Sequence, residues 1–254
     1  MNAGPAPLAG QAALVTGAAR RVGAALATAF HAAGARVAVH YRSSQAAAEA
    51  LVASLNGSRA DSALAFRADL ADPAACDTLV AEVVRAFGRL DVLVNNASTF
   101  YPTPMGTITP DQFDDLVGSN LRAPLFLSQA AAAALAKHEG LILNIGDIHG
   151  LRPLTGHAVY CAAKAGLLML TRSLARELGP EIRVNAIAPG PVMWPERGVD
   201  AALRERIVAR TALKRAGSAD DVAKAALYFA TGAPFVTGQV LAVDGGRLVG
   251  GADR

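Results

Sequence analysis

Cysteine, tryptophan and net charge are all scarce in this chain of 254 residues. The only cysteines, Cys76 and Cys161, lie far apart, which excludes a disulfide framework and leaves no metal-binding spacing. The five histidines show no ligand spacing either, so we expect no metal site. This cysteine usage fits a reducing compartment, and we expect a cytoplasmic protein. The formal net charge of +3 is too small to favour nucleic acid as a partner.

Long apolar runs are absent too, although 52% of the residues are hydrophobic. Alanine supplies much of that fraction, and no run of 18 uninterrupted apolar residues occurs, so we expect no membrane span and no membrane partner. Residues 1–10 contain neither a basic region nor an apolar signal segment, and we expect a flexible lead-in there. Residues 11–254 suit a single domain, because α/β domains often reach about 250 residues.

Short apolar runs alternate with helical patterns along the whole chain. Their hydrophobicity is nearly continuous, which is typical of strands buried on both faces of a parallel sheet. The predicted strands are Ala12–Thr16, Arg36–Tyr41, Ala63–Ala68, Asp91–Asn95, Gly140–Ile145, Arg183–Ala188 and Val240–Val243. The predicted helices are Arg21–Ala33, Gln45–Asn56, Pro73–Phe87, Pro110–Lys137, His157–Leu178 and Ala219–Ala230. Repeated β-α-β units predict an α/β Rossmann fold, a doubly wound parallel sheet of seven strands with helices on both faces.

The first predicted strand leads through a short loop into the first predicted helix. Such a start exposes backbone N–H groups and the positive end of a helix dipole, which suit a pyrophosphate. We therefore expect a dinucleotide to contact Gly17, Arg21, Val22 and Gly23. A surface arginine at a helix start is the alternative interpretation of Arg21.

The second predicted strand ends without the acidic residue that usually binds the ribose diol of NAD. Arg42 with Ser43 and Ser44 could instead hold a 2′-phosphate through charge-assisted hydrogen bonds. We therefore predict NADPH as the cofactor, with His40, Tyr41, Arg42 and Ser43 at its site. A basic surface turn is the alternative.

Tyr160 and Lys164 are spaced i,i+4 on a predicted helix, which places the phenol above the ammonium. A nearby cation favours the phenolate, so we expect Lys164 to lower the pKa of Tyr160 and make it a proton donor. Asp147 precedes Tyr160 by thirteen residues. A carboxylate there would repel a developing alkoxide, and it suits proton delivery to a ring nitrogen. The alternative is an aspartate that caps a loop.

The segment around Tyr160 and Lys164 closely resembles the short-chain dehydrogenase/reductase family, in which serine normally stands at the position of Asp147. The resemblance implies that Asn120 supports the lysine through water, as a fourth catalytic residue. It also implies a homotetramer. Further cofactor contacts implied by it are Asp69 and Leu70 at the adenine, Asn96, Ala97 and Ser98 at the cofactor, and Pro189 and Gly190 at the nicotinamide.

Arg21, Asp147 and the stretch Asn96–Pro104 are similar to the pteridine reductase branch of that family. In this branch arginine replaces a loop glycine, and a phenylalanine stacks a flat heteroaromatic ring against the nicotinamide. The resemblance implies substrate contacts from Arg21, Ser98, Phe100, Asp147, Tyr160 and Trp194. The alternatives are a Phe100 that anchors its loop in the core, and a Trp194 that only packs within a lid over residues 193–213.

We therefore expect NADPH-dependent reduction of a pterin, either biopterin or a dihydropterin such as dihydrobiopterin, with dihydrofolate as a further candidate. The proton would come from Tyr160 or from a water held by Asp147. One alternative is an NADPH-dependent carbonyl or 3-oxoacyl-thioester reductase, as in many members of the family. The segment Thr237–Gly246 is shared with those enzymes, so it supports the fold and does not discriminate the substrate. Another alternative is a non-catalytic regulatory protein that senses NADPH, which the Tyr160–Lys164 pair disfavours.

Overall fold

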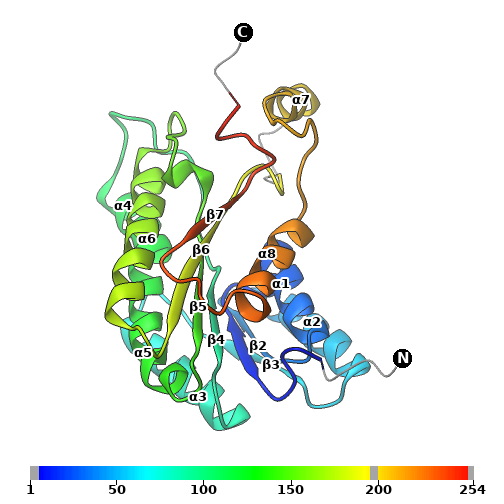
Figure 1. Cartoon of the computed structure of the whole chain (residues 1–254). Helices are drawn as coiled ribbons and strands as arrows, with labels where there is room; N and C mark the ends of the chain where they lie inside the picture. The colour runs from blue at the N-terminus through cyan, green and yellow to red at the C-terminus, as the bar shows by residue number, and fades with distance from the viewer. Residues whose placement is uncertain (1–5, 195–199, 251–254) are drawn as a thin grey trace.

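Seven parallel strands form the centre of the molecule, in the order β3-β2-β1-β4-β5-β6-β7 (Figure 1). The computed structural model describes residues 6–194 and 200–250. The strands are β1 Ala12–Val15, β2 Arg36–Tyr41, β3 Ala63–Arg67, β4 Val92–Asn95, β5 Leu141–Ile145, β6 Arg183–Pro189 and β7 Val240–Val243. This arrangement confirms the predicted Rossmann-type sheet.

Helices cover both faces of the sheet. They are α1 Arg21–Ala32, α2 Gln45–Ser58, α3 Pro73–Phe87, α4 Pro110–Val117, α5 Ala123–Ala136, α6 Ala158–Glu177 and α8 Ala219–Thr231. A further helix, α7 Ala201–Ala209, has no buried residue and lies away from the sheet (Figure 1). Figure 1 shows α1, α2 and α8 on one side, and α3 to α6 on the other. Alternate side chains of β1 supply the two cores: Ala13 and Val15 pack on the α1 side, Ala12 and Leu14 on the α3 side. The strand period of two thus explains why an almost wholly apolar strand is buried on both faces.

The order of the strands reverses beside β1, because β1 pairs with β2 on one edge and with β4 on the other. The loops that leave β1 and β4 therefore diverge to opposite faces of the sheet. Open α/β sheets bind their ligands in the crevice at such a switch point. The residues after Val15 and after Asn95 are thus the first place to look for a site.

The predicted helix Pro110–Lys137 is wrong as one element, since it consists of α4, a π-helical turn at Gly118–Arg122 and α5. Pro124 has no N–H to donate within the first turn of α5, so regular helical pairing is interrupted there. π-helical turns frequently occur at functional sites, and this one contains Asn120. The helix α7, Ala201–Ala209, was not predicted from the sequence.

The expectation of a flexible lead-in over residues 1–10 is wrong for residues 6–10. Leu8 is buried in the core on the α1 side, and its N–H donates to the carbonyl of Ala33 at 2.8 Å. This short segment therefore covers the end of α1. Residues 1–5 lie outside the described residues.

In the part of the chain that the structure describes, no helix is long and apolar enough to cross a membrane. Over the same residues, no group of three or more His, Cys, Asp or Glu side chains could hold a metal ion. Cys76 and Cys161 are both buried and free.

Candidate active site

The loop between β1 and α1 is packed so tightly that its glycines are required. A Cβ atom at Gly23 would lie 2.2 Å from the carbonyl oxygen of Gly17 and 2.7 Å from Nδ2 of Asn96. That amide donates to the carbonyl of Thr16 at 2.8 Å, so β4 braces the loop from the side. A backbone held this close, at the start of a helix, is suited to the approach of a phosphate group.

Thr16 is a structural residue of this loop that sequence reasoning missed. Its hydroxyl accepts hydrogen bonds from the N–H groups of Asn96 at 2.9 Å and Ala97 at 3.0 Å. It lies 3.2 Å from the carbonyl of Val94, to which it donates. Thr16 therefore ties the carboxyl end of β1 to that of β4, and it positions the Asn96–Ala97 segment that was predicted to border the cofactor.

Arg21 has a left-handed backbone with φ +57°, a conformation that side chains rarely adopt. This geometry explains why the family prefers glycine there. Nη2 of Arg21 donates to the carbonyl of Trp194 at 3.1 Å. Two predicted substrate residues, far apart in the sequence, therefore meet across the mouth of the site.

The ring of His40, a predicted cofactor residue, is turned into the protein, so any contact of this residue with the cofactor stays a prediction. The ring is only 2% exposed, and Nδ1 accepts the N–H of Gly17 at 3.1 Å while Nε2 donates to the carbonyl of Ala68 at 3.2 Å. These partners fix the tautomer that carries its proton on Nε2. Burial lowers the pKa of His40 to about 4, so the ring is neutral near pH 7. His40 therefore supports the β1–α1 loop from beneath.

The end of β2 leaves Arg42 and Ser43 exposed, whereas Tyr41 packs partly against the core. Within the described residues, the guanidinium of Arg42 has no hydrogen bond or ion pair. An unengaged cation with a neighbouring hydroxyl fits a phosphate group beyond this strand.

The other predicted cofactor residues also follow the carboxyl ends of strands. Asp69 is exposed after β3 and accepts the N–H of Ala71 at 3.1 Å, whereas Leu70 is buried. Val22 packs against the core at the start of α1. Pro189 ends β6, and the N–H of Gly190 donates to the carbonyl of Val243 at 3.0 Å. The topology thus brings all of these positions to one edge of the sheet.

Asp147 and Tyr160 are in direct contact, since the phenolic hydroxyl donates to Oδ2 of Asp147 at 2.8 Å. Oδ1 of Asp147 accepts the N–H of His149 at 2.8 Å and caps the short 3₁₀ helix Ile148–Gly150. The interpretation of Asp147 as a capping residue is therefore confirmed, and proton delivery by its carboxylate stays a prediction. A Cβ atom at Gly150 would lie 2.9 Å from the backbone of Lys164, so glycine lets this turn pack closely on α6.

The expected lowering of the pKa of Tyr160 is wrong. Burial, followed by the charge of Asp147, raises the pKa of the phenol well above its usual value. Hydrogen bonding by Ser98 opposes this rise in part. Lys164 is buried, with Nζ 5.8 Å from the centre of the Tyr160 ring and donating to the carbonyl of Ile145 at 2.9 Å. Burial lowers the pKa of this ammonium to about 8, and the charge of Asp147 opposes the lowering.

Asn120 holds the loop after β4. Its Oδ1 accepts the hydroxyl of Ser98 at 2.7 Å, and Nδ2 donates to the carbonyl of Thr99 at 3.0 Å. Nδ2 also lies 2.9 Å from the carbonyl of Leu116, on the preceding turn. These contacts place Ser98 beside the reactive phenol. Support of Lys164 by Asn120 through water stays a prediction.

Phe100 projects from the same loop and is 45% exposed, which excludes its role as a core anchor. Its ring stacks on the imidazole of His157 with centroids 4.8 Å apart and planes 12° apart. The ring of Phe100 also makes a T-shaped contact with the ring of Tyr160, with centroids 4.8 Å apart and planes at 76°. His157 is a second residue that sequence reasoning missed, although it lies only three positions before Tyr160.

Trp194 lies at the start of the predicted lid, which contains α7. Its ring is 5.7 Å from the guanidinium carbon of Arg204 on α7, and its carbonyl accepts from Arg21. These contacts fit packing within the lid, so substrate contact by this side chain stays a prediction. Residues 195–199 of the lid lie outside the described residues.

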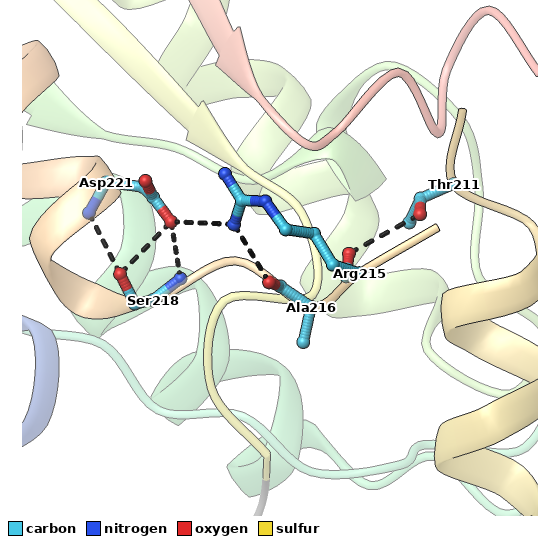
Figure 2. A network of polar contacts seen from close by, with 5 residues as sticks. All are labelled: Thr211, Arg215, Ala216, Ser218 and Asp221. Atoms are coloured by element: carbon cyan, nitrogen blue, oxygen red, sulfur yellow. Dashed lines mark hydrogen bonds and ion pairs between the residues drawn. The ribbon is translucent and has the colours of Figure 1, made fainter. Parts of the chain in front are cut away.

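A cavity of about 390 Å³ opens at the carboxyl ends of β6 and β7. Its lining includes Pro191, Val192, Leu213 and Leu241, with Arg215 and Asp221. Figure 2 shows Arg215 reaching Asp221 at 3.4 Å, while Ser218 and Asp221 cap the start of α8 reciprocally. Thr211 donates to the carbonyl of Arg215 at 3.4 Å. This network holds the segment from α7 to α8 at the rim of the cavity, beside the turn that follows β6.

The sequence and the fold both have well-defined relatives. The family described as Enoyl-(Acyl carrier protein) reductase matches residues 17–247. Pteridine reductase 1 of Leishmania tarentolae is 37% identical, over 92% of this chain and 95% of that protein. The 3-oxoacyl-(acyl-carrier-protein) reductase FabG of Staphylococcus aureus is 35% identical, over 94% of this chain and 98% of that protein.

Two solved structures superpose closely on this chain. A blue fluorescent protein from a metagenomic library, in complex with NADPH, is 38% identical with a TM-score of 0.89. A short chain dehydrogenase from Burkholderia cenocepacia J2315, in complex with NADP, is 38% identical with a TM-score of 0.90. Each comparison covers 95% of this chain and 99% of the other.

Proposed function

The chain belongs to the short-chain dehydrogenase/reductase family, and from that premise we propose that it is an NADPH-dependent pteridine reductase. One observation carries the proposal: the carboxylate of Asp147 accepts a hydrogen bond from the hydroxyl of Tyr160 at 2.8 Å, at the position where the family resemblance implies a serine. An anion at this position suits a substrate that gains a proton on nitrogen. It does not suit one that develops negative charge on oxygen, for which hydrogen-bond donors are needed.

The residues present fit NADPH. The β1–α1 loop offers a close approach to the backbone at Gly17 and Gly23, as a pyrophosphate requires. Arg42 and Ser43 stand exposed beyond β2, where they would hold the 2′-phosphate. Lys164 would bind the nicotinamide ribose, and Pro189–Gly190 would border the nicotinamide. When bound, the cofactor supplies a hydride to a carbon of the substrate C=N bond.

The proton would reach the substrate nitrogen through Asp147. The raised pKa of Tyr160 keeps its phenol protonated near pH 7, so its hydroxyl orients the carboxylate and releases its own proton with difficulty. Each oxygen of Asp147 accepts one hydrogen bond from the protein and retains a second lone pair. A water bound there would be placed to give a proton to the nitrogen, and the hydroxide left behind would take a proton back from solvent. Both predicted donors, the phenol and this water, are retained, because an ordinary water is a weaker acid than an ordinary phenol.

A planar substrate would be held by an aromatic wall. Nearly half of the surface of Phe100 is exposed beside Tyr160, and a heteroaromatic ring could stack on it. Ser98 would meet the polar edge of such a ring. Arg21 and Trp194 would close the opposite side, where they already touch each other. Biopterin, dihydrobiopterin and dihydrofolate all carry a suitable bicyclic ring.

The second candidate is reduction of a carbonyl, such as that of a 3-oxoacyl thioester. Two observations favour it: the similar identity to FabG, and the position of Ser98, whose hydroxyl partly opposes the rise in the pKa of Tyr160. Ser98 could thus replace the hydroxyl that is absent at position 147. However, its hydrogen is directed to Oδ1 of Asn120, so it would have to leave that partner to stabilise an oxyanion.

A single comparative assay distinguishes the candidates. NADPH consumption is followed with biopterin, dihydrobiopterin, dihydrofolate and an acetoacetyl thioester under identical conditions. The proposal requires a pterin to be turned over with the highest kcat/KM. Faster turnover of the thioester rejects it, and firm NADPH binding without turnover of any of them would indicate a regulatory protein.

We also propose a cytoplasmic homotetramer. β7 is an edge strand of the sheet, and large apolar side chains are exposed on and near it, among them Tyr228, Phe235 and Leu241. Burial of an exposed edge strand between copies would remove a hazard of aggregation. Light scattering after size-exclusion chromatography tests the subunit number, and a monomer would contradict it.

A further inference from the structure

The loop that carries Phe100 is attached to the start of α6 by a short β-bridge. Thr103 pairs with His157 in this bridge, and the N–H of Thr103 donates to the carbonyl of Gly156 at 2.6 Å. Two segments that are distant in the sequence are therefore joined directly in front of Tyr160. The bridge brings the imidazole of His157 to the ring of Phe100.

The rings of Phe100 and His157 are almost parallel, with centroids 4.8 Å apart and planes 12° apart. One face of Phe100 is thus covered by the protein, so at most one face remains for a ligand ring. Phe100 still exposes 45% of its surface. A flat substrate would therefore be the third ring of a stack whose first two rings belong to the protein.

Both ends of this arrangement are fixed by polar contacts. The carbonyl of Thr99, next to Phe100, accepts from Asn120 at 3.0 Å, and the hydroxyl of Thr99 lies 2.6 Å from that of Ser119. On the other side, Nδ1 of His157 donates to the carbonyl of Thr155 at 3.0 Å. That bond sets the plane of the imidazole, and the imidazole in turn sets the plane of Phe100.

We propose that His157 is a positioning residue for planar substrates, acting through Phe100. It backs the phenyl ring and holds it parallel to the incoming heterocycle, so that binding does not require the ring to be ordered first. This inference rests on the proposed function, because only a flat substrate uses the face of Phe100. A flexible acyl thioester gains nothing from the plane of that ring.

The test uses His157→Ala, which removes the stack, and His157→Phe, which keeps an aromatic ring without the imidazole nitrogens. Binding of biopterin in the presence of NADP is followed by quenching of pterin fluorescence, and steady-state kinetics are measured with dihydrobiopterin. Since an aromatic pair contributes about 0.5–1.5 kcal/mol, His157→Ala should raise the Kd and KM by about 2- to 12-fold. His157→Phe should stay within about twofold of the unaltered protein, and NADPH affinity should stay the same in both variants.

A double-mutant cycle separates positioning from simple structural support. In a Phe100→Ala background, His157→Ala should have no further effect on pterin affinity, because the ring that it positions is gone. An equal loss in both backgrounds, or a failure of His157→Phe to restore affinity, would overturn the inference while leaving the proposed function intact. If the unaltered protein binds no pterin, the proposed function fails and this inference fails with it.

Discussion

The hydroxyl of Tyr160 donates to Oδ2 of Asp147 across 2.8 Å, and this contact sets the chemistry of the site. It gives the phenol an anionic neighbour, which with burial raises its pKa. It also leaves the carboxylate doubly hydrogen-bonded and fixed at the start of a 3₁₀ helix. Tyr160 and Asp147 thus fix each other's orientation at the point where the proton would be delivered.

Replacement of Arg42 by alanine should weaken the preference for NADPH over NADH. Charge-assisted hydrogen bonds to a phosphate contribute about 1.5–3 kcal/mol, so the ratio of the two affinities should fall by about 10-fold or more. Isothermal titration with both cofactors measures it. Arg85→Ala is a matched control, because Arg85 is an exposed arginine on α3 whose side chain is 79% exposed. Equal binding of both cofactors by the unaltered protein would refute the assignment of the residues after β2 to the 2′-phosphate.

Arg21→Gly should make the protein more stable but a poorer enzyme. Glycine removes the cost of a left-handed backbone, about 1–2 kcal/mol, while the contact with Trp194 and any contact with phosphate are lost. Urea unfolding measures the gain in the free energy of unfolding. The KM values for NADPH and for dihydrobiopterin, which should rise, measure the loss of these contacts. Asp61→Gly is the control, since Asp61 is exposed and also left-handed at φ +54°. It should gain stability without any change in KM; a loss of stability in both variants would contradict the backbone argument.

His40 should make the stability of the fold depend on pH below neutrality. The unfolded chain binds a proton on this histidine below about pH 6.5, whereas the folded ring resists protonation down to about 4. The unfolded state is therefore favoured as the pH falls, and the free energy of unfolding should drop by about 3 kcal/mol across this window from this group alone.

His40→Gln should be less stable at pH 7 but should lack this part of the pH dependence. Urea unfolding at pH 7.0, 5.5 and 4.5 measures the difference between the two slopes. His138→Gln removes an exposed histidine and should keep the dependence of the unaltered protein. Parallel slopes for the unaltered protein and His40→Gln would show that His40 titrates normally.

The sequence predicted the sheet well because buried parallel strands are nearly continuous apolar runs, as in β1. It failed at Pro110–Lys137, because the π-helical turn Gly118–Arg122 continues the helix with a changed hydrogen-bond pattern, which the sequence does not reveal. α7 was missed because none of its residues is buried, so it has no apolar face to detect.

The site shows what local patterns cannot predict. Spacing placed Lys164 under Tyr160, but the depth of burial, which reverses the expected pKa shift, is a tertiary property. The inward orientation of the His40 ring was not predicted, because a side chain at the end of a strand cannot be oriented from sequence. His157 was missed because its partner Phe100 comes from another loop, and only the β-bridge at Thr103 brings the two together.

The central claim is that the carboxylate of Asp147 serves a substrate nitrogen, and an exchange of this residue tests it most directly. kcat/KM is measured with dihydrobiopterin and with acetoacetyl thioester for the unaltered protein, Asp147→Ser and Asp147→Asn. Because general acid–base assistance contributes about 10²-fold or more, pterin turnover should fall by that factor in both variants. Asp147→Ser alone should gain turnover of the thioester, since it restores the hydroxyl beside Tyr160. Unchanged pterin turnover in Asp147→Ser would contradict the account.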